Sequence, residues 1–210
     1  MKEKEMSFST RRLTILGLMV GILLLMPYTP LGYLNIGPLA ITFNMIPVAI
    51  CAITLGPIGG VIAGSVFGIT SFCQCFGGLG IGVSPMGAIL FGINPFLAFI
   101  QRFVPRALVG FLLGYIFRWA KKIKGISFAT SVTGFFAAFL NTVFFMIALL
   151  VLYGNTDYVQ GLIGGQNIIV FACAFVGVNA VVEMIASTIV TGAIGTALFK
   201  TRIISISDEK

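Results

Sequence analysis

The segment NMIPVAICAITLGPIGGVIAGSVFG, residues 44–68, is apolar and uncharged, and the tripeptide Leu55-Gly56-Pro57 interrupts it. Proline cannot continue a helix but is well suited to begin one, so the tripeptide predicts a tight turn between two apolar helices. The first helix, about residues 42–55, is short. The second, about residues 57–75, approaches the roughly 20 residues that cross a bilayer. The segment therefore predicts two successive membrane spans joined by a tight turn.

The composition of the whole chain supports a membrane environment. Of its 210 residues 58% are hydrophobic, only 9% are charged, and none is histidine. So little charge would not cover the surface of a soluble domain. Glycine (26 residues) and phenylalanine (20 residues) are abundant, as expected where helices pack closely and face lipid. We expect one all-α membrane domain.

The positions of the charged residues predict the topology. Apolar spans are expected at about residues 12–27, 42–55, 57–75, 95–118, 127–152 and 168–199. With the N-terminus inside, the cytoplasmic segments carry Lys2, Lys4, Arg11, Arg12, Arg118, Lys121, Lys122, Lys124, Lys200, Arg202 and Lys210. The outer loops carry only Asp157, so the positive-inside rule predicts six transmembrane helices with both termini cytoplasmic. The expected parts are a cytoplasmic segment 1–11, a membrane domain 12–199 and a cytoplasmic tail 200–210. Topology thus accounts for the net charge of +7, and no nucleic-acid partner is expected.

Missing residue types exclude several functions. The chain has no G-x-x-x-x-G-K-[ST] sequence, so it does not bind ATP through a P-loop. Without histidine it lacks Ser-His and Cys-His nucleophiles and His-ligated metals. Glu183 is the single acid within the spans, so a catalytic carboxylate pair is also missing. We expect no enzyme, metal or cofactor, which leaves a transporter, a channel or a binding subunit. The cysteines, at positions 51, 73, 75 and 173, are interpreted as apolar filler.

Three of the expected spans carry glycines four residues apart, which lie on one helix face and leave it without side chains. Gly60, Gly64 and Gly68 in the third span, with Gly110 and Gly114 in the fourth, are interpreted as packing surfaces within the bundle. The pair Gly17 and Gly21 follows the basic start of the first span, where it is equally suited to dock another membrane protein.

Residues 44–68 resemble the second and third spans of the substrate-binding S components of energy-coupling factor (ECF) vitamin transporters. In that family a short Pro-bearing span, a Leu-Gly-Pro turn and a glycine-rich span follow one another. The resemblance covers nearly the whole chain, although Gly17 and Gly21 replace the alanines common in the family's first-helix motif. It implies a bundle in a prokaryotic plasma membrane that captures a vitamin from outside. A T component and two ATPases would then drive release, with ATP bound by the ATPases, and Gly17 and Gly21 would dock the T component.

Two arginines interrupt the fourth span. Arg102 and Arg106 are four residues apart, so they share a helix face, about 6 Å apart along the axis. Because this span begins outside and side chains tilt toward a helix N-terminus, both are expected to lean outward. We expect Arg106 to pair with Glu183 near the midplane, where an unpaired charge is most costly. Arg102 then remains for a ligand carboxylate, unless it reaches lipid headgroups or carbonyls freed at Pro105.

Uncharged polar residues are the other candidates for ligand contact. Asn141 and Asn179 are suited to bind amide and hydroxyl groups, although each is equally suited to join two helices. Tyr28 and Tyr33, in the first outer loop, are expected to close over the site. The weaker candidates for ligand contact are Gln74, Asn155, Gln166 and Asn167.

Within the family, a small anionic ligand with amide and hydroxyl groups indicates pantothenate. The stretch beginning Gln74-Cys-Phe-Gly, followed by Ile-Asn-Pro and Val-Pro-Arg, also resembles pantothenate-type S components. Folate and riboflavin remain alternatives, as do two other classes, a secondary transporter and a structural membrane protein.

Overall fold

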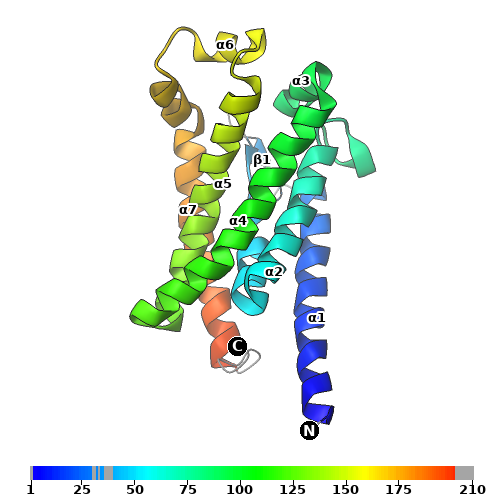
Figure 1. Ribbon diagram of the computed structural model, residues 1–210, viewed down its shortest axis with the longest axis vertical. Coiled ribbons are helices and arrows are strands. Elements are labelled where there is room, and N and C mark those ends of the chain that lie inside the picture. Colours follow the sequence, from blue (N-terminus) through cyan, green and yellow to red (C-terminus); the bar gives the residue numbers. More distant parts are fainter. Residues whose placement is uncertain (1, 30–31, 33, 36–39, 202–210) are drawn as a thin grey trace.

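The computed structural model describes residues 2–29, 32, 34–35 and 40–201 and is predominantly helical (Figure 1). Its elements are α1 (Lys2–Leu25), η1 (Met26–Tyr28), β1 (Leu34–Asn35), β2 (Ala40–Ile41), α2 (Met45–Cys73), η2 (Gly78–Gly80), α3 (Pro85–Ile93), α4 (Pro95–Lys124), α5 (Ile126–Tyr153), α6 (Asp157–Ile163) and α7 (Ile168–Lys200). The two short strands pair antiparallel, with Leu34 opposite Ile41 and Asn35 opposite Ala40.

The turn expected at Leu55-Gly56-Pro57 divides α2 into two halves. Gly56 has φ 72° and ψ −162°, a left-handed backbone that glycine adopts without strain. Residues eight apart in one straight helix are separated by about 12 Å. A Cβ placed on Gly60, however, would lie 3.1 Å from the Cβ of Ala52. The second half of α2 therefore folds back on the first, as the sequence predicted.

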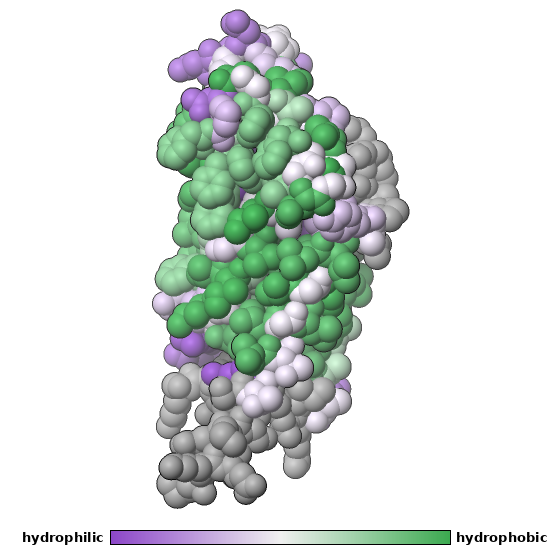
Figure 2. Space-filling view, turned by 90° about the vertical axis from the view of Figure 1, so that its right-hand side faces the viewer, coloured by the Kyte–Doolittle hydropathy of each residue, from purple (hydrophilic) through white to green (hydrophobic). Residues whose placement is uncertain are grey.

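Four of the described helices, α2, α4, α5 and α7, are long and apolar enough to cross a membrane. Residues 12–28 form a shorter apolar helix. Figure 2 shows apolar side chains over the middle of one face and polar ones near its ends, as expected for a bundle surrounded by lipid. Helix α1 begins and α7 ends at the same end of the bundle, an arrangement that an even number of crossings requires (Figure 1). The count of six spans and the cytoplasmic side stay predictions.

Backbone contact between α2 and α4 explains the glycines of the third and fourth spans. A Cβ on Gly60 would overlap the carbonyl oxygen of Gly110, and a Cβ on Gly110 would overlap that of Gly60. A Cβ on Gly64 would likewise overlap the carbonyl oxygen of Arg106. These glycines pack within the bundle, as the sequence indicated, and they bring the arginine-bearing helix against α2.

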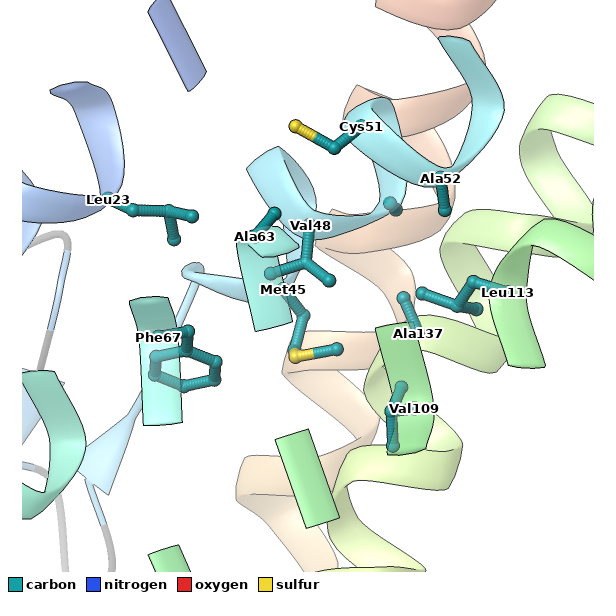
Figure 3. Packing of buried hydrophobic residues seen from close by; sticks show 11 residues of the cluster. Leu23, Met45, Val48, Cys51, Ala52, Ala63, Phe67, Val109, Leu113 and Ala137 are labelled. Carbon is teal, nitrogen blue, oxygen red and sulfur yellow. The ribbon is translucent and has the colours of Figure 1, made fainter. Parts of the chain in front are cut away.

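The main apolar core lies where α1, α2, α4 and α5 meet (Figure 3). Phe67 of α2 is its largest buried side chain, and the same cluster includes Met45 from the other half of that helix. A second core, at the end of the bundle that bears α3 and α6, joins these two short helices to α5 and α7. Its Tyr153 hydroxyl donates hydrogen bonds to the carbonyl oxygens of Leu90, at 3.2 Å, and Asn94, at 3.1 Å. The start of α4 is thereby fixed to the end of α5.

The elements differ from the sequence prediction in several respects. Helix α1 begins at Lys2, within the segment 1–11 expected to precede the first span, and β1 and β2 pair in the expected first outer loop. Helix α4 continues to Lys124 through residues expected in a cytoplasmic loop, and Gly125 alone separates it from α5. Lysines favour this extension because they are good helix formers and stabilise the negative end of the helix dipole. In addition, α3 and α6 lie within segments expected to be loops.

Candidate functional site

A cavity of about 360 Å³ lies inside the bundle, near the end that bears α3. Every long helix except α1 contributes to its wall, together with η1, the residue Thr42 and the segment before α3. The lining residues are Pro27, Thr42, Phe67, Ser71, Gln74, Gly82, Val83, Ser84, Pro85, Met86, Arg102, Arg106, Asn141, Thr142, Phe145, Val176, Asn179, Ala180 and Glu183. Segments far apart in the sequence therefore form one chamber.

The two arginines of α4 line this cavity side by side, as their spacing predicted. Both are buried, and both guanidinium groups lie against the ring of Phe145 from α5. The Cζ atoms of Arg102 and Arg106 are 5.4 and 4.9 Å from the centre of that ring. Arg106 also lies 5.6 Å from the ring centre of Phe67. Ring faces attract cations, so the aromatic pair helps to hold two buried like charges on one wall of the cavity.

Arg102 has unused hydrogen-bonding capacity. It is 6% exposed, and its Nη1 donates to the Ser71 hydroxyl over 3.5 Å, at the long limit for a hydrogen bond. Its Nε is buried without a partner in the described part of the chain. A guanidinium in this state is suited to an anionic ligand, because two parallel N–H groups match a carboxylate.

Arg106 lies deeper and is tied to the protein. Its Nη1 donates to the Gln101 carbonyl oxygen at 3.0 Å, and its charge acts on the carboxylate of Glu183. Glu183 Oε1 in turn accepts a 2.7 Å hydrogen bond from the backbone N–H of Thr42. The structure thus brings Arg106 and Glu183 to the same cavity wall, and their direct ion pair stays a prediction.

The amide side chains named from the sequence also meet here. Asn141 is 5% exposed, and its Oδ1 is buried without a partner among the described residues. Asn179 lines the cavity from α7, which packs against α5, and Gln74 lies just after α2. The Gln74 carbonyl oxygen accepts a 3.0 Å hydrogen bond from the Ser84 N–H, which closes the segment between α2 and α3.

The remaining sequence candidates that the structure describes are absent from the cavity lining. The Tyr28 hydroxyl donates to the Leu79 carbonyl oxygen, and this side chain is mostly exposed. Tyr33 lies outside the described residues. Asn155 and Gln166 are exposed, and Asn167 caps α7 by accepting from the Ile169 N–H. The four cysteines are unpaired, and no cluster suited to a metal is found in the described residues.

Sequence reasoning missed several lining residues. Ser71, Thr42 and Phe145 were not singled out, and neither was the start of α3. A local signal for α3 was available, because Ser84 followed by Pro85 is a typical helix start. No comparable signal marks Phe145, since an aromatic residue in an apolar span usually packs in the core or faces lipid.

The glycine face of α1 is open. A Cβ on Gly17 or on Gly21 would meet no atom within 4 Å in the described structure. Gly17 and Gly21 therefore differ from Gly60 and Gly110, which pack against a neighbouring backbone.

The sequence is similar to known proteins over a range that contains the whole cavity lining. A family model described as the substrate-specific component of ECF transporters matches residues 11–195, a range that includes every lining residue. The chain is also 32% identical, over 199 residues, to the pantothenate transporter PanT of Leuconostoc mesenteroides. That alignment covers 90% of this chain and 92% of the relative.

Proposed function

This chain belongs to the family of substrate-specific components of ECF transporters, and we propose that it captures pantothenate outside the cell for import. Membership confirms the resemblance drawn from residues 44–68. It also establishes that the chain is a membrane-integral transport protein and not an enzyme. The identity of the vitamin and the way it is released belong to the proposal.

The observation that carries the proposal is that two buried polar atoms in one cavity lack hydrogen-bond partners among the described residues. Arg102 Nε needs an acceptor and Asn141 Oδ1 needs a donor, and the described chain supplies neither. A buried polar group without a partner costs about 1–3 kcal/mol, and more when it is charged. A ligand that combines a carboxylate with hydroxyl or amide N–H groups would satisfy both atoms at once.

Pantothenate has this combination: one carboxylate, one amide and two hydroxyl groups on a short flexible chain. The cavity of about 360 Å³ lies near the lower end of the range of about 300–1,000 Å³ for small-molecule sites. Such a size favours a small vitamin over riboflavin or folate, which carry fused rings. The aromatic rings of the lining, Phe67 and Phe145, already contact arginines. The name of the Leuconostoc relative supports the same ligand.

Delivery is proposed to follow the family's arrangement, with a T component and two ATPases as partners in the plasma membrane. In this arrangement ATP is bound by the ATPases, in keeping with the absence of a P-loop here. The open face at Gly17 and Gly21 supports docking of the T component, because small residues allow close approach of another helix.

The test begins with the protein purified from cells and mass spectrometry of the small molecule it retains. Titration calorimetry of ligand-free protein with pantothenate, riboflavin and folate follows. We expect retained pantothenate and binding of that vitamin alone. Retention of riboflavin or folate would replace pantothenate in the proposal, and binding of none of the three would reject pantothenate together with both alternatives.

A further inference from the structure

We propose that the start of α3 forms the carboxylate subsite together with Arg102, with Ser84 as a specificity-determining residue. This inference rests on the proposed function, because it assigns an orientation to the anionic ligand in the cavity. The carboxylate lies against both the first turn of α3 and Arg102, and the hydroxyl end lies toward Asn141 and Asn179.

The first turn of α3 faces the cavity through Ser84, Pro85 and Met86. Pro85 has no N–H, and the Gly87 N–H donates to the Ser84 hydroxyl oxygen at 3.3 Å. The Ala88 N–H donates to the Ser84 carbonyl oxygen at 2.8 Å. The Met86 N–H has no acceptor within its own helix, because the first N–H groups of a helix point beyond its end. This N–H and the positive end of the helix dipole both favour an anion.

The guanidinium of Arg102 lies over the same turn. Its Nη2 is 3.2 Å from the position that a Cβ on Gly87 would occupy, so the glycine at this position leaves room for the arginine. Arg102 is 6% exposed, and its Nε lacks a partner among the described residues. A buried cation with an unmet N–H and a helix start thus face one part of the cavity. The charge pattern of the two elements is complementary to a carboxylate.

The cavity wall at Glu183 is less suited to a carboxylate than the wall at Arg102. The carboxylate of Glu183, on α7, already accepts from the Thr42 N–H and offsets the charge of Arg106, so a second carboxylate beside it would be repelled. Asn141, with its unmet Oδ1, and Asn179 are instead suited to bind hydroxyl and amide groups. Electrostatics therefore favours one orientation of a ligand that is charged at one end.

Two substitutions of Ser84 separate charge from helix capping. Aspartate and asparagine are both good N-cap residues and have nearly the same shape, so Ser84→Asp and Ser84→Asn should both preserve α3. Only the aspartate adds a negative charge to the proposed subsite. Binding of two ligands is compared in each variant: pantothenate, and pantothenol, which carries a hydroxyl group in place of the carboxylate.

We expect Ser84→Asp to weaken pantothenate binding on the order of 100-fold relative to Ser84→Asn, as measured by titration calorimetry. Pantothenol affinity should differ little between the two variants, and both should unfold at similar temperatures. Equal pantothenate affinity of the two variants would overturn the subsite, and so would an equal loss for both ligands. Failure of the wild type to bind pantothenate would instead reject the proposed function.

Discussion

The backbone N–H of Thr42 donates a 2.7 Å hydrogen bond to Glu183 Oε1, across 141 positions of the sequence. The bond joins the chain just after β2 to the middle of α7, on the wall of the cavity. Glu183 also interacts electrostatically with Arg106. One carboxylate therefore fixes the segment that leads into α2 and offsets a buried positive charge.

Substitutions of Glu183 should separate these two effects. Glu183→Gln keeps an oxygen for the Thr42 N–H but removes the charge, whereas Glu183→Ala removes both. We expect both to lower the melting temperature of the purified protein, because Arg106 loses its counter-charge. Glu183→Ala should cost about 1–3 kcal/mol more, for the Thr42 N–H left without its acceptor. Equal melting temperatures for the two variants would show that the Thr42 bond adds no stability.

The open glycine face of α1 predicts a loss of assembly without a loss of binding. Combining Gly17→Leu with Gly21→Leu should abolish vitamin uptake and copurification with the T component, because leucines prevent close helix approach. Pantothenate binding should remain, since a Cβ at either position meets no atom within 4 Å in the described structure.

Gly110→Leu provides the matched control for this test. Its side chain would overlap the Gly60 backbone, so this variant should fail to fold. Lost binding with intact assembly in the α1 variant would mean that Gly17 and Gly21 pack inside the bundle.

The predicted topology places Asn155 outside the cell and Lys122 inside. Both residues are exposed and lie near opposite ends of α5, Lys122 just before its start and Asn155 just after its end, so cysteines placed there are accessible to reagents. The background protein should carry Cys173→Ser, because Cys173 is the exposed native cysteine. In intact cells an impermeant thiol reagent should label Asn155→Cys and leave Lys122→Cys unmodified. The reverse pattern would invert the orientation.

Much of the fold could be predicted because local chemistry determines it. Pro57 requires a turn, and glycines at a spacing of four required a close neighbour for α2 and α4. The short helices α3 and α6 were missed because segments with apolar and turn-forming residues were interpreted as loops, although both helices carry capping signals. Thr156 before Asp157 and Gly164 after Ile163 mark the ends of α6 as clearly as Ser84 and Pro85 mark the start of α3.

The candidate site was predictable where a polar residue is costly in a membrane. Arg102, Asn141 and Asn179 had to face a cavity or a partner, and they do line one cavity. Ser71 and Phe145 could not be singled out in this way, because serine and phenylalanine are common in apolar spans for reasons of packing alone. Their roles depend on how α2, α4 and α5 pack against one another. The spacing of residues within one helix does not predict that packing.

Phe145 should act as a positioning residue for the arginines. Phe145→Leu keeps an apolar side chain but removes the ring that both guanidinium groups contact, and we expect pantothenate affinity to fall by about 1–2 kcal/mol. Pantothenol should be affected less, and Phe145→Tyr should preserve binding of both ligands. Phe171→Leu is the matched control, because Phe171 belongs to the same apolar core but not to the cavity lining. A uniform loss for both ligands would assign Phe145 to packing alone.

The two arginines should respond differently to the same substitution although they share a helix face. Arg102→Ala should leave a stable protein whose pantothenate affinity falls by about 2–5 kcal/mol, since it removes a desolvated partner of the carboxylate. Arg102→Lys should restore part of that affinity, because an ammonium group keeps the charge but not the paired N–H groups. Arg106→Ala should chiefly lower the melting temperature, because Glu183 then stays buried without its cation. Titration calorimetry and thermal unfolding distinguish the variants. If Arg106→Ala stays stable but loses binding while Arg102→Ala binds like the wild type, the roles of the two residues are exchanged.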